Sequence, residues 1–325
     1  MTHYWPIPFI EEKTFSSIEE RRKVALVTTA AAWAAVESRL NLSIVWQAEM
    51  NEATVPAWRK LLDTIEGEVI YAVGGGLAVD AAKYLAAEKD LPLVCLPTAL
   101  SVDAFLTWAS GYREGDCVRY VETRCPDRLI IDYDVLASAP ESIRAAGICD
   151  TLSIATGRWD WKYAEEKGMN TEATRFIPYI DRMAEAILNG SLDCAASAGR
   201  GERDGLKQLL DGLAMEVQMC NLIGHSRPEE GSEHYFAYSV ENTMGKGLPH
   251  GDLVGPGILL MAEFQGQETA PLRKALEDCQ IQLNSIPNPV IRETLLNLPD
   301  YCRKQGLPHG IAHDLTQDQI DRLVP

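Results

Sequence analysis

Three side chains that are far apart in the sequence have the chemistry of a catalytic metal site. Asp150, in AAGICDTL, lies in an otherwise apolar stretch that is predicted to be helical. A buried carboxylate without a partner is costly, so Asp150 requires one. His234, in GSEHYF, and His250, in LPHGDL, lie inside or at the start of predicted helices. Two imidazoles and one carboxylate, with open coordination positions, suit a divalent metal that takes part in catalysis.

The sequence leaves an alternative for each of these residues. A single His within a helix is more often an ordinary core or surface residue, and Asp150 has a candidate ion-pair partner in Arg144. No two of the three metal candidates lie four residues apart, so helical spacing alone does not bring them onto one face. The metal site is therefore a hypothesis about tertiary structure.

Three consecutive glycines, Gly74, Gly75 and Gly76, follow the apolar run GEVIYAV and precede the helix-like LAVDAAKYLAAEK. The start of a helix presents unpaired N–H groups and a partial positive charge, and glycine lets a phosphate approach the backbone closely. The pattern favours a pyrophosphate site. The alternative is a tight strand-to-helix turn without a ligand, since neither G-x-G-x-x-G nor a Walker A sequence is present.

A second polar loop, PTALSVDAF, follows the next predicted strand. In doubly wound sheets the loops at the carboxyl ends of neighbouring strands share one crevice, where ligands bind. Thr98 and Ser101 would offer hydroxyls to that crevice, and the Asp103 carboxylate could accept hydrogen bonds from a polyol substrate. The alternative is a series of capping residues that begins a helix.

The elements that must position these residues fall into two groups. Short apolar strands alternate with helices in the first 139 residues, which predicts a parallel sheet covered on both faces. Beyond that point the sequence has helical spacing without alternation of β-branched residues. We expect an α/β domain over residues 1–139 and an all-α domain over residues 140–325. Strands are predicted around 23–28, 42–49, 67–76, 91–98 and 127–136, and the first helical stretches after them over 139–168, 170–189, 202–224, 231–245 and 250–267.

Composition narrows the class of protein. The net charge of −17 and the pI of about 4.8 disfavour binding to the phosphate backbone of nucleic acids. The eight cysteines occur singly, without a C-x-x-C pair, as expected for reduced thiols in a cytoplasmic protein. No apolar run reaches the ~18 residues of a membrane span, and the first residues lack the pattern of a secretion signal.

Five motifs together resemble one superfamily: GGGLAVDAAK, PTALSVD, AAGICD, SRPEEGSEH and LPHGDLVGPG. The sequence is similar to the glycerol dehydrogenase, iron-containing alcohol dehydrogenase and dehydroquinate synthase-like proteins, and most of all to the sn-glycerol-1-phosphate dehydrogenase branch. The resemblance covers Gly74 to Gly266, with the motifs in family order. It implies a Rossmann-like domain that binds NAD(H) or NADP(H), a helical domain that binds Zn²⁺ or else Ni²⁺ or Fe²⁺, an active site in the interdomain cleft, and a homo-oligomer.

The resemblance also implies a reaction and a role for each motif. The reaction is the reversible reduction of dihydroxyacetone phosphate to sn-glycerol 1-phosphate, a precursor of glycerophospholipids. The alternatives are a dehydrogenase of glycerol, another polyol or an alcohol, and a relative that binds nucleotide without turnover. The implied residues are Gly74, Gly75 and Gly76 at the pyrophosphate, Asp80 near the cofactor, Thr98 and Ser101 in contact with it, Asp103 at a substrate hydroxyl, and Asp150, His234 and His250 at the metal.

Two departures from the family pattern concern the cofactor and the width of the pocket. Many relatives carry an acid after the first strand to hold the adenosine ribose, where this sequence has Thr28 and Thr29. The choice between NAD and NADP therefore stays open. Phe105 and Trp108 stand where relatives carry smaller residues, so the pocket would be narrower if they point into it.

A third departure concerns the substrate. Glu229 and Glu230 lie close to the region that would handle the phosphate. Two acids there would oppose a phosphorylated substrate unless Arg227 is turned toward it and the acids face solvent.

Overall fold

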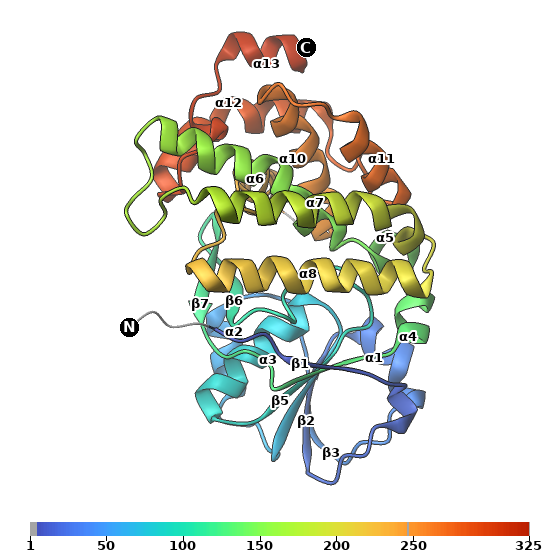
Figure 1. Cartoon of the computed structure of the whole chain (residues 1–325). Helices are drawn as coiled ribbons and strands as arrows, with labels where there is room; N and C mark the ends of the chain where they lie inside the picture. The colour runs from blue at the N-terminus through green and yellow to red at the C-terminus, as the bar shows by residue number, and fades with distance from the viewer. Residues whose placement is uncertain (1–4, 246, 325) are drawn as a thin grey trace.

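The protein consists of a parallel sheet with its helices, below, and a group of helices, above (Figure 1). The computed structural model describes residues 5–245 and 247–324. In this part of the chain six strands form one sheet, all neighbours parallel, in the order β1-β8-β5-β4-β2-β3. The strands are β1 (Phe9–Glu12), β2 (Val24–Thr28), β3 (Ile44–Glu49), β4 (Val69–Val73), β5 (Leu93–Leu96) and β8 (Arg128–Ile131).

The centre of the sheet is built from continuous apolar runs. Every residue of β2, VALVT, and of β4, VIYAV, is buried, as expected for strands with both faces covered. The chain passes from β2 to β3 on one side and then returns to β4 on the other side of β2. The loops after β2 and β4 therefore flank a topological switch point, the usual place for a ligand in such sheets.

Five of the six strands were predicted from the sequence, and β1 was missed. Its four residues, FIEE, contain only two apolar side chains, too few to show alternation, and they pair with β8 at the edge of the sheet. The helices of this part are α1 (Ala30–Val36), α2 (Val55–Leu61), α3 (Gly76–Lys89) and α4 (Tyr133–Ser138).

The structure also contains an antiparallel hairpin that was not predicted from the sequence. It consists of β6 (Ala109–Glu114) and β7 (Cys117–Glu122), joined at Gly115, whose φ of 59° favours glycine. The hairpin reaches from the sheet to the upper helices (Figure 1), where the Tyr301 hydroxyl donates to the carbonyl of Asp116. It thus links the two parts of the molecule.

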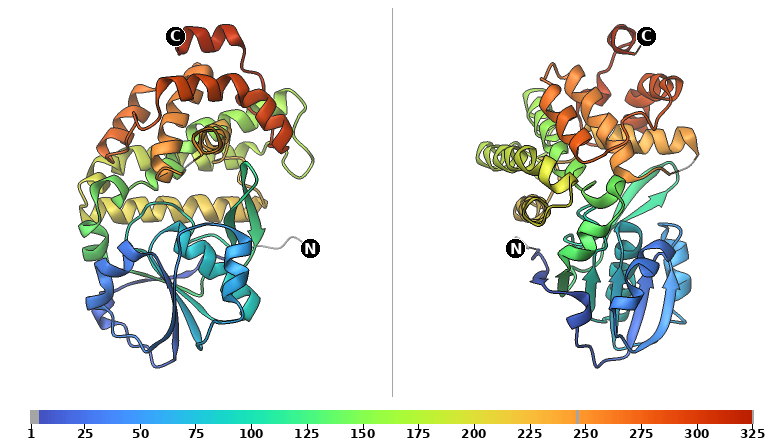
Figure 2. Two further views of the ribbon diagram at one scale, coloured as in Figure 1. Left: turned by 180° about the vertical axis from the view of Figure 1, so that it is seen from behind. Right: turned by 90° about the vertical axis from the view of Figure 1, so that its right-hand side faces the viewer.

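The upper part is helical, as predicted, with two corrections to its boundaries. The stretch 139–168 is interrupted at 145–147, and the stretch 170–189 becomes helical only at Pro178, which occupies the first turn because proline lacks the N–H needed further inside. Figure 2 shows these helices stacked above the sheet from two further sides. They are α5 (Glu141–Arg144), α6 (Ile148–Glu166), α7 (Pro178–Gly199), α8 (Arg203–Ile223), α9 (Ser232–Met244), α10 (His250–Phe264), α11 (Ala270–Asp278), α12 (Asn288–Gln305) and α13 (Gln317–Leu323).

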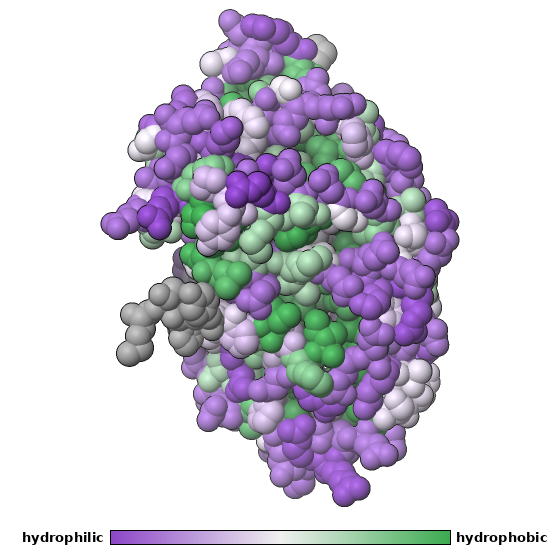
Figure 3. All heavy atoms as spheres, in the orientation of Figure 1, coloured by the Kyte–Doolittle hydropathy of each residue, from purple (hydrophilic) through white to green (hydrophobic). Residues whose placement is uncertain are grey.

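One hydrophobic core extends through both parts, from sheet residues such as Val27 and Ile70 to Leu213 of α8 and Ile258 of α10. The division into domains at residue 139 stays a prediction. On the outside, hydrophilic side chains predominate, with apolar ones gathered across the middle of the face in Figure 3. Helices α7 and α8, which cross that face in Figure 1, expose Tyr179, Met183, Met215 and Leu222.

Helices α9 and α10 approach each other very closely at one glycine. A Cβ added to Gly257 of α10 would lie 2.7 Å from the Glu233 carbonyl oxygen on α9. That distance is too short for a non-bonded contact with backbone, so the two helices would have to separate. Because α9 and α10 carry His234 and His250, this close contact helps to bring the two imidazoles near each other.

We predict that Gly257→Ala lowers the free energy of unfolding by about 1–3 kcal/mol, the usual range for overpacking, and weakens zinc binding. Urea unfolding and zinc titration measure the two effects. Gly190→Ala in α7 is the matched control, because nothing lies within 4 Å of its added Cβ. The control should be neutral or stabilise by up to ~1 kcal/mol. Equal stability of the two variants would contradict this packing argument.

Candidate active site

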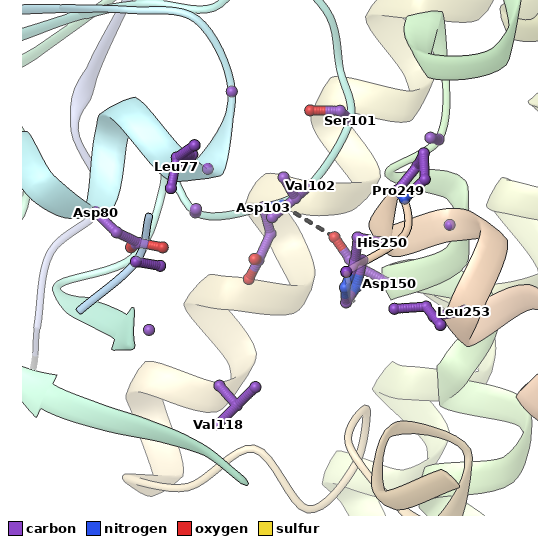
Figure 4. A pocket seen from close by; sticks show the side chains of 18 of the residues that line it. Leu77, Asp80, Ser101, Val102, Asp103, Val118, Asp150, Pro249, His250 and Leu253 are labelled. Carbon is purple, nitrogen blue, oxygen red and sulfur yellow. Dashed lines mark hydrogen bonds and ion pairs between the residues drawn. The ribbon is translucent and has the colours of Figure 1, made fainter. Parts of the chain in front are cut away.

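A cavity of about 1250 Å³ lies between the carboxyl ends of the strands and the upper helices. It exceeds the ~300–1,000 Å³ of most small-molecule pockets, so it has room for a dinucleotide together with a small substrate. The structure brings nearly all the predicted residues together here; Gly74 is not part of the cavity wall. Figure 4 shows several of them around the open space. The lining residues from the predicted set are Gly75, Gly76, Asp80, Thr98, Ser101, Asp103, Asp150, His234 and His250.

Each of the three glycines is favoured at its position for a different structural reason. Gly74 has a φ of 134°, a conformation that residues with a side chain rarely adopt. A Cβ on Gly75 would lie 2.9 Å from the Ser101 Oγ, so the two polar loops touch at this point. Gly76 begins α3, and this start of the helix lines the cavity beside these loops. The arrangement can hold a phosphate at the helix N-terminus.

Asp80 of α3 lines the cavity and also forms a buried ion pair. Its Oδ1 lies 3.0 Å from the Nζ of Lys83, a side chain with no exposure to solvent. The same Nζ donates to the carbonyl of Ala104 and to the Thr107 Oγ1, both at 2.9 Å. Lys83, which the sequence analysis missed, therefore fastens the Asp103-bearing loop to α3.

Asp150, His234 and His250 converge, although they come from α6, α9 and α10. One ligand atom of each lies within 4.8 Å of the other two. The His250 Nε2 is 2.9 Å from the Asp150 Oδ1, and the two imidazole centroids are 5.5 Å apart. Arg144, the alternative partner of Asp150, instead donates to the carbonyls of Ala139 and Gly199.

Neighbouring groups orient two of these three side chains. The Asp150 Oδ2 accepts a hydrogen bond of 2.9 Å from the backbone N–H of Asp103, drawn as the dashed line in Figure 4. The His234 Nδ1 lies 2.9 Å from the Glu233 Oε1, a carboxylate that also accepts from the Thr156 hydroxyl. A carboxylate on Nδ1 leaves Nε2 free as a ligand, the arrangement that is usual for metal-binding histidines.

The electrostatics of the site also suit a cation. Burial lowers the pKa of His234, but the hydrogen bond and charge of Glu233, with the charges of Glu230 and Asp150, outweigh it and raise the value to about 9. The imidazole is therefore surrounded by excess negative charge. Two imidazoles and a carboxylate with open positions fit Zn²⁺, Fe²⁺ or a similar divalent ion, so the residues present are suited to the group that the resemblance implies.

A second group of acids adjoins the first. Asp103, Glu216 and Glu229 each place one carboxylate oxygen within 4.8 Å of the others. Burial raises the pKa of all three carboxyls, and neighbouring carboxylates raise them further. Glu229 was noted from the sequence, whereas Glu216 was not, because it lies within α8 among apolar neighbours.

The structure also places three residues that bear on the substrate and on the width of the pocket: Arg227, Phe105 and Trp108. Arg227 is turned away from the cavity, since its guanidinium donates to the carbonyls of Asp160 and His309. Phe105 is buried in the core, whereas Trp108 lines the cavity and donates through Nε1 to Asn221. Trp108 therefore narrows the pocket, and Phe105 does not.

All eight cysteines are free thiols, as predicted. A search of residues 5–245 and 247–324 for a helix long and apolar enough to cross a membrane finds none.

The families and names of similar known proteins agree with the chemistry of this site. Residues 11–140 match the iron-containing alcohol dehydrogenase family. The chain is 29% identical over 254 residues to a glycerol-1-phosphate dehydrogenase [NAD(P)+] of Sulfurisphaera tokodaii, an alignment that covers 76% of this chain and 71% of the relative. A protein of the same name from Methanothermobacter thermautotrophicus is 30% identical over 234 residues, or 71% of this chain and 65% of the relative. The chain is thus similar in sequence to members of the glycerol dehydrogenase and iron-containing alcohol dehydrogenase superfamily.

Solved structures of this superfamily have the same fold. Glycerol dehydrogenase from Schizosaccharomyces pombe superposes with a TM-score of 0.70 at 20% identity, covering 98% of this chain and 90% of that one. Sulfoacetaldehyde reductase from Bifidobacterium kashiwanohense, solved with NAD+, gives a TM-score of 0.68 at 16% identity, covering 100% and 98%. The family and its curated members place this chain among the NAD(P)-dependent oxidoreductases.

We predict that His250→Ala weakens zinc binding by at least about 100-fold, more than the loss of an outer-shell partner usually costs. Zinc titration against a competing chelator measures the change, and circular dichroism of the metal-free protein should stay as in the wild type. His225→Ala is the control, because His225 lines the same cavity outside the Asp150–His234–His250 group. Zinc affinity that is equal in the two variants would exclude His250 as a ligand.

Proposed function

We propose that the protein is a metal-dependent, NAD(P)H-linked dehydrogenase that reduces dihydroxyacetone phosphate to sn-glycerol 1-phosphate, reversibly. The observation that carries the proposal is that Asp150, His234 and His250 share one cavity with the glycine-rich start of α3. The curated relatives, whose names state this activity, support the choice of substrate.

Asp150, His234 and His250 would hold the metal, most suitably Zn²⁺, with Ni²⁺ or Fe²⁺ as alternatives. When bound, the metal supplies Lewis-acid polarisation of the substrate carbonyl, and the nicotinamide supplies the hydride. The backbone N–H groups at Gly75 and Gly76 would bind the pyrophosphate. Thr98 and Ser101 would contact the same cofactor. Asp80, which pairs with Lys83, would fix the position of α3 beneath the cofactor.

Asp103 would orient the substrate. Its carboxylate is free of hydrogen bonds to other described residues, and its backbone N–H is committed to Asp150. A carboxylate placed in this way can accept a hydrogen bond from a substrate hydroxyl while its main chain positions a metal ligand. The substrate carbonyl would then be aligned with both metal and nicotinamide.

An unphosphorylated polyol such as glycerol is the second candidate, and the charge of the cavity favours it. Among the described lining residues Arg113 is the one lysine or arginine, and its guanidinium pairs with Glu241 at 3.0 Å. Arg227 faces away, whereas Glu229 and Glu230 line the cavity. Within residues 5–245 and 247–324, the lining groups thus offer a phosphate ester no unpaired lysine or arginine.

We expect NADH or NADPH to be oxidised with dihydroxyacetone phosphate in the presence of added Zn²⁺ or Ni²⁺, and the reaction to stop with a chelator. Loss of reduced-nicotinamide absorbance measures the rate. Dihydroxyacetone runs in parallel, and turnover with it alone would move the assignment to a glycerol-type dehydrogenase. Cofactor binding without turnover on any ketone would contradict the enzymatic proposal and favour a nucleotide-binding relative.

The cofactor preference has its own structural indication. Asn51 and Glu52, just after β3, line the cavity, as does Thr29 after β2. Arg113 also lines this part, since its backbone N–H donates to the carbonyl of Ala53, but its guanidinium is paired with Glu241. An acid near the adenosine ribose favours a 2′-hydroxyl over a 2′-phosphate. We predict a kcat/KM for NADH at least about tenfold that for NADPH, ~1.4 kcal/mol, and a reduced ratio in Glu52→Lys. A preference for NADPH in the wild type would contradict this placement of the ribose.

The cytoplasmic location and the homo-oligomer stay predictions from the sequence.

A further inference from the structure

Glu216 is a buried acid without a partner. Its side chain, in the middle of α8, has no exposure to solvent, and neither carboxylate oxygen has a hydrogen-bond partner among the described residues. Its neighbours Leu213 and Val217 are buried and apolar. Burying such a group as a carboxylate is costly, so in the described residues alone the neutral, protonated form is favoured, and a bound cation is what would stabilise the charged form.

The free oxygens of Glu216 face two further carboxylates. One carboxylate oxygen each of Asp103, Glu216 and Glu229 lies within 4.8 Å of the other two. The Glu229 carboxylate is also within hydrogen-bond reach of Glu216, when one of the two is protonated, and of the Cys220 thiol, but it has no ion pair with a described lysine or arginine. Glu230, the adjacent acid, instead accepts hydrogen bonds from the Tyr238 and Ser226 hydroxyls, at 2.7 and 2.8 Å. Three carboxyl groups without a lysine or arginine partner among the described residues therefore converge here.

We propose that Asp103, Glu216 and Glu229 bind a second divalent cation, separate from the metal at Asp150, His234 and His250. Oxygens around one ion at about 2.0–2.6 Å lie at most roughly twice that distance apart, which matches the spacing within this group. An all-carboxylate site selects hard ions such as Mg²⁺ or Mn²⁺, whereas imidazoles favour zinc. The two sites thus differ in ligand chemistry as well as in position.

The second cation would act on the same substrate. Asp103 connects the two sites, because its backbone N–H donates to Asp150 while its carboxylate belongs to the second group. The ion would offset the acids that oppose a phosphate ester and supply the positive charge that Arg227 and Arg113 do not. This role in substrate binding rests on the proposed function, whereas binding of the cation does not.

Metal counting tests the proposal. Protein loaded with one Zn²⁺ per chain is dialysed against Mn²⁺, and both metals are measured by mass spectrometry, with free Mn²⁺ followed by electron paramagnetic resonance. Zinc stays in the histidine site because it binds nitrogen ligands more tightly than manganese does. We expect one additional Mn²⁺ per chain in the wild type.

Glu216→Gln should weaken Mn²⁺ binding at least about tenfold and retain the zinc, and Glu230→Gln, the matched control, should retain both metals. If Glu216→Gln does not fold, as judged by circular dichroism, Glu229→Gln takes its place, since Glu229 is only partly buried. The proposal is overturned if the zinc-loaded wild type takes up no Mn²⁺. That result is expected if Glu216 and Glu229 share a proton, or if they bind a cationic group of a substrate instead of a metal. Mn²⁺ uptake that Glu216→Gln leaves unchanged would overturn it equally. Because the count requires no turnover, it is independent of whether dihydroxyacetone phosphate is reduced.

Discussion

The site depends on carboxyl groups that the fold buries with few lysine or arginine partners among the described residues. Asp150, Glu233, Glu216 and Glu229 lie close together where the upper helices meet the sheet, and the lysine buried nearby, Lys83, is committed to Asp80. Burying carboxylates costs several kcal/mol each unless a positive partner is close. A bound metal is such a partner, so the binding of ions and the stability of this region are two aspects of one constraint.

The backbone is arranged to hold this charge in place. Strands β2 and β4 end at the switch point of the sheet, which directs the loops after them, and the loop after β5 beside them, toward the helices. Close packing at Gly257 brings α9 and α10 together, so that two histidines sixteen positions apart in the chain reach the same Asp150. The residues that we propose for the cofactor, the substrate and the metal then lie around one cavity, as a hydride transfer to a polarised carbonyl would require.

The sequence predicted what depends on local pattern. From it we could recognise fully buried strands such as VIYAV, the glycines at the start of α3 and the residue types of the proposed metal site. It could not show that Asp150, His234 and His250 meet, because that follows from helix packing. The hairpin 109–122 was missed because its charged and polar residues obscure the alternation of a strand pair. Glu233 and Glu216 were missed for another reason, since an acid within a helix usually faces water, and only burial distinguishes these two.

The central claim is that the metal is held by two imidazoles and oxygen ligands, without sulfur. Zinc K-edge X-ray absorption of the zinc-loaded protein tests it most directly, and the test is discriminating because Cys220 also lines the cavity. The account predicts a first shell of nitrogen and oxygen at about 2.0–2.2 Å with the outer-shell scattering of two imidazoles. A sulfur scatterer near 2.3 Å, or the absence of imidazole scattering, would contradict it.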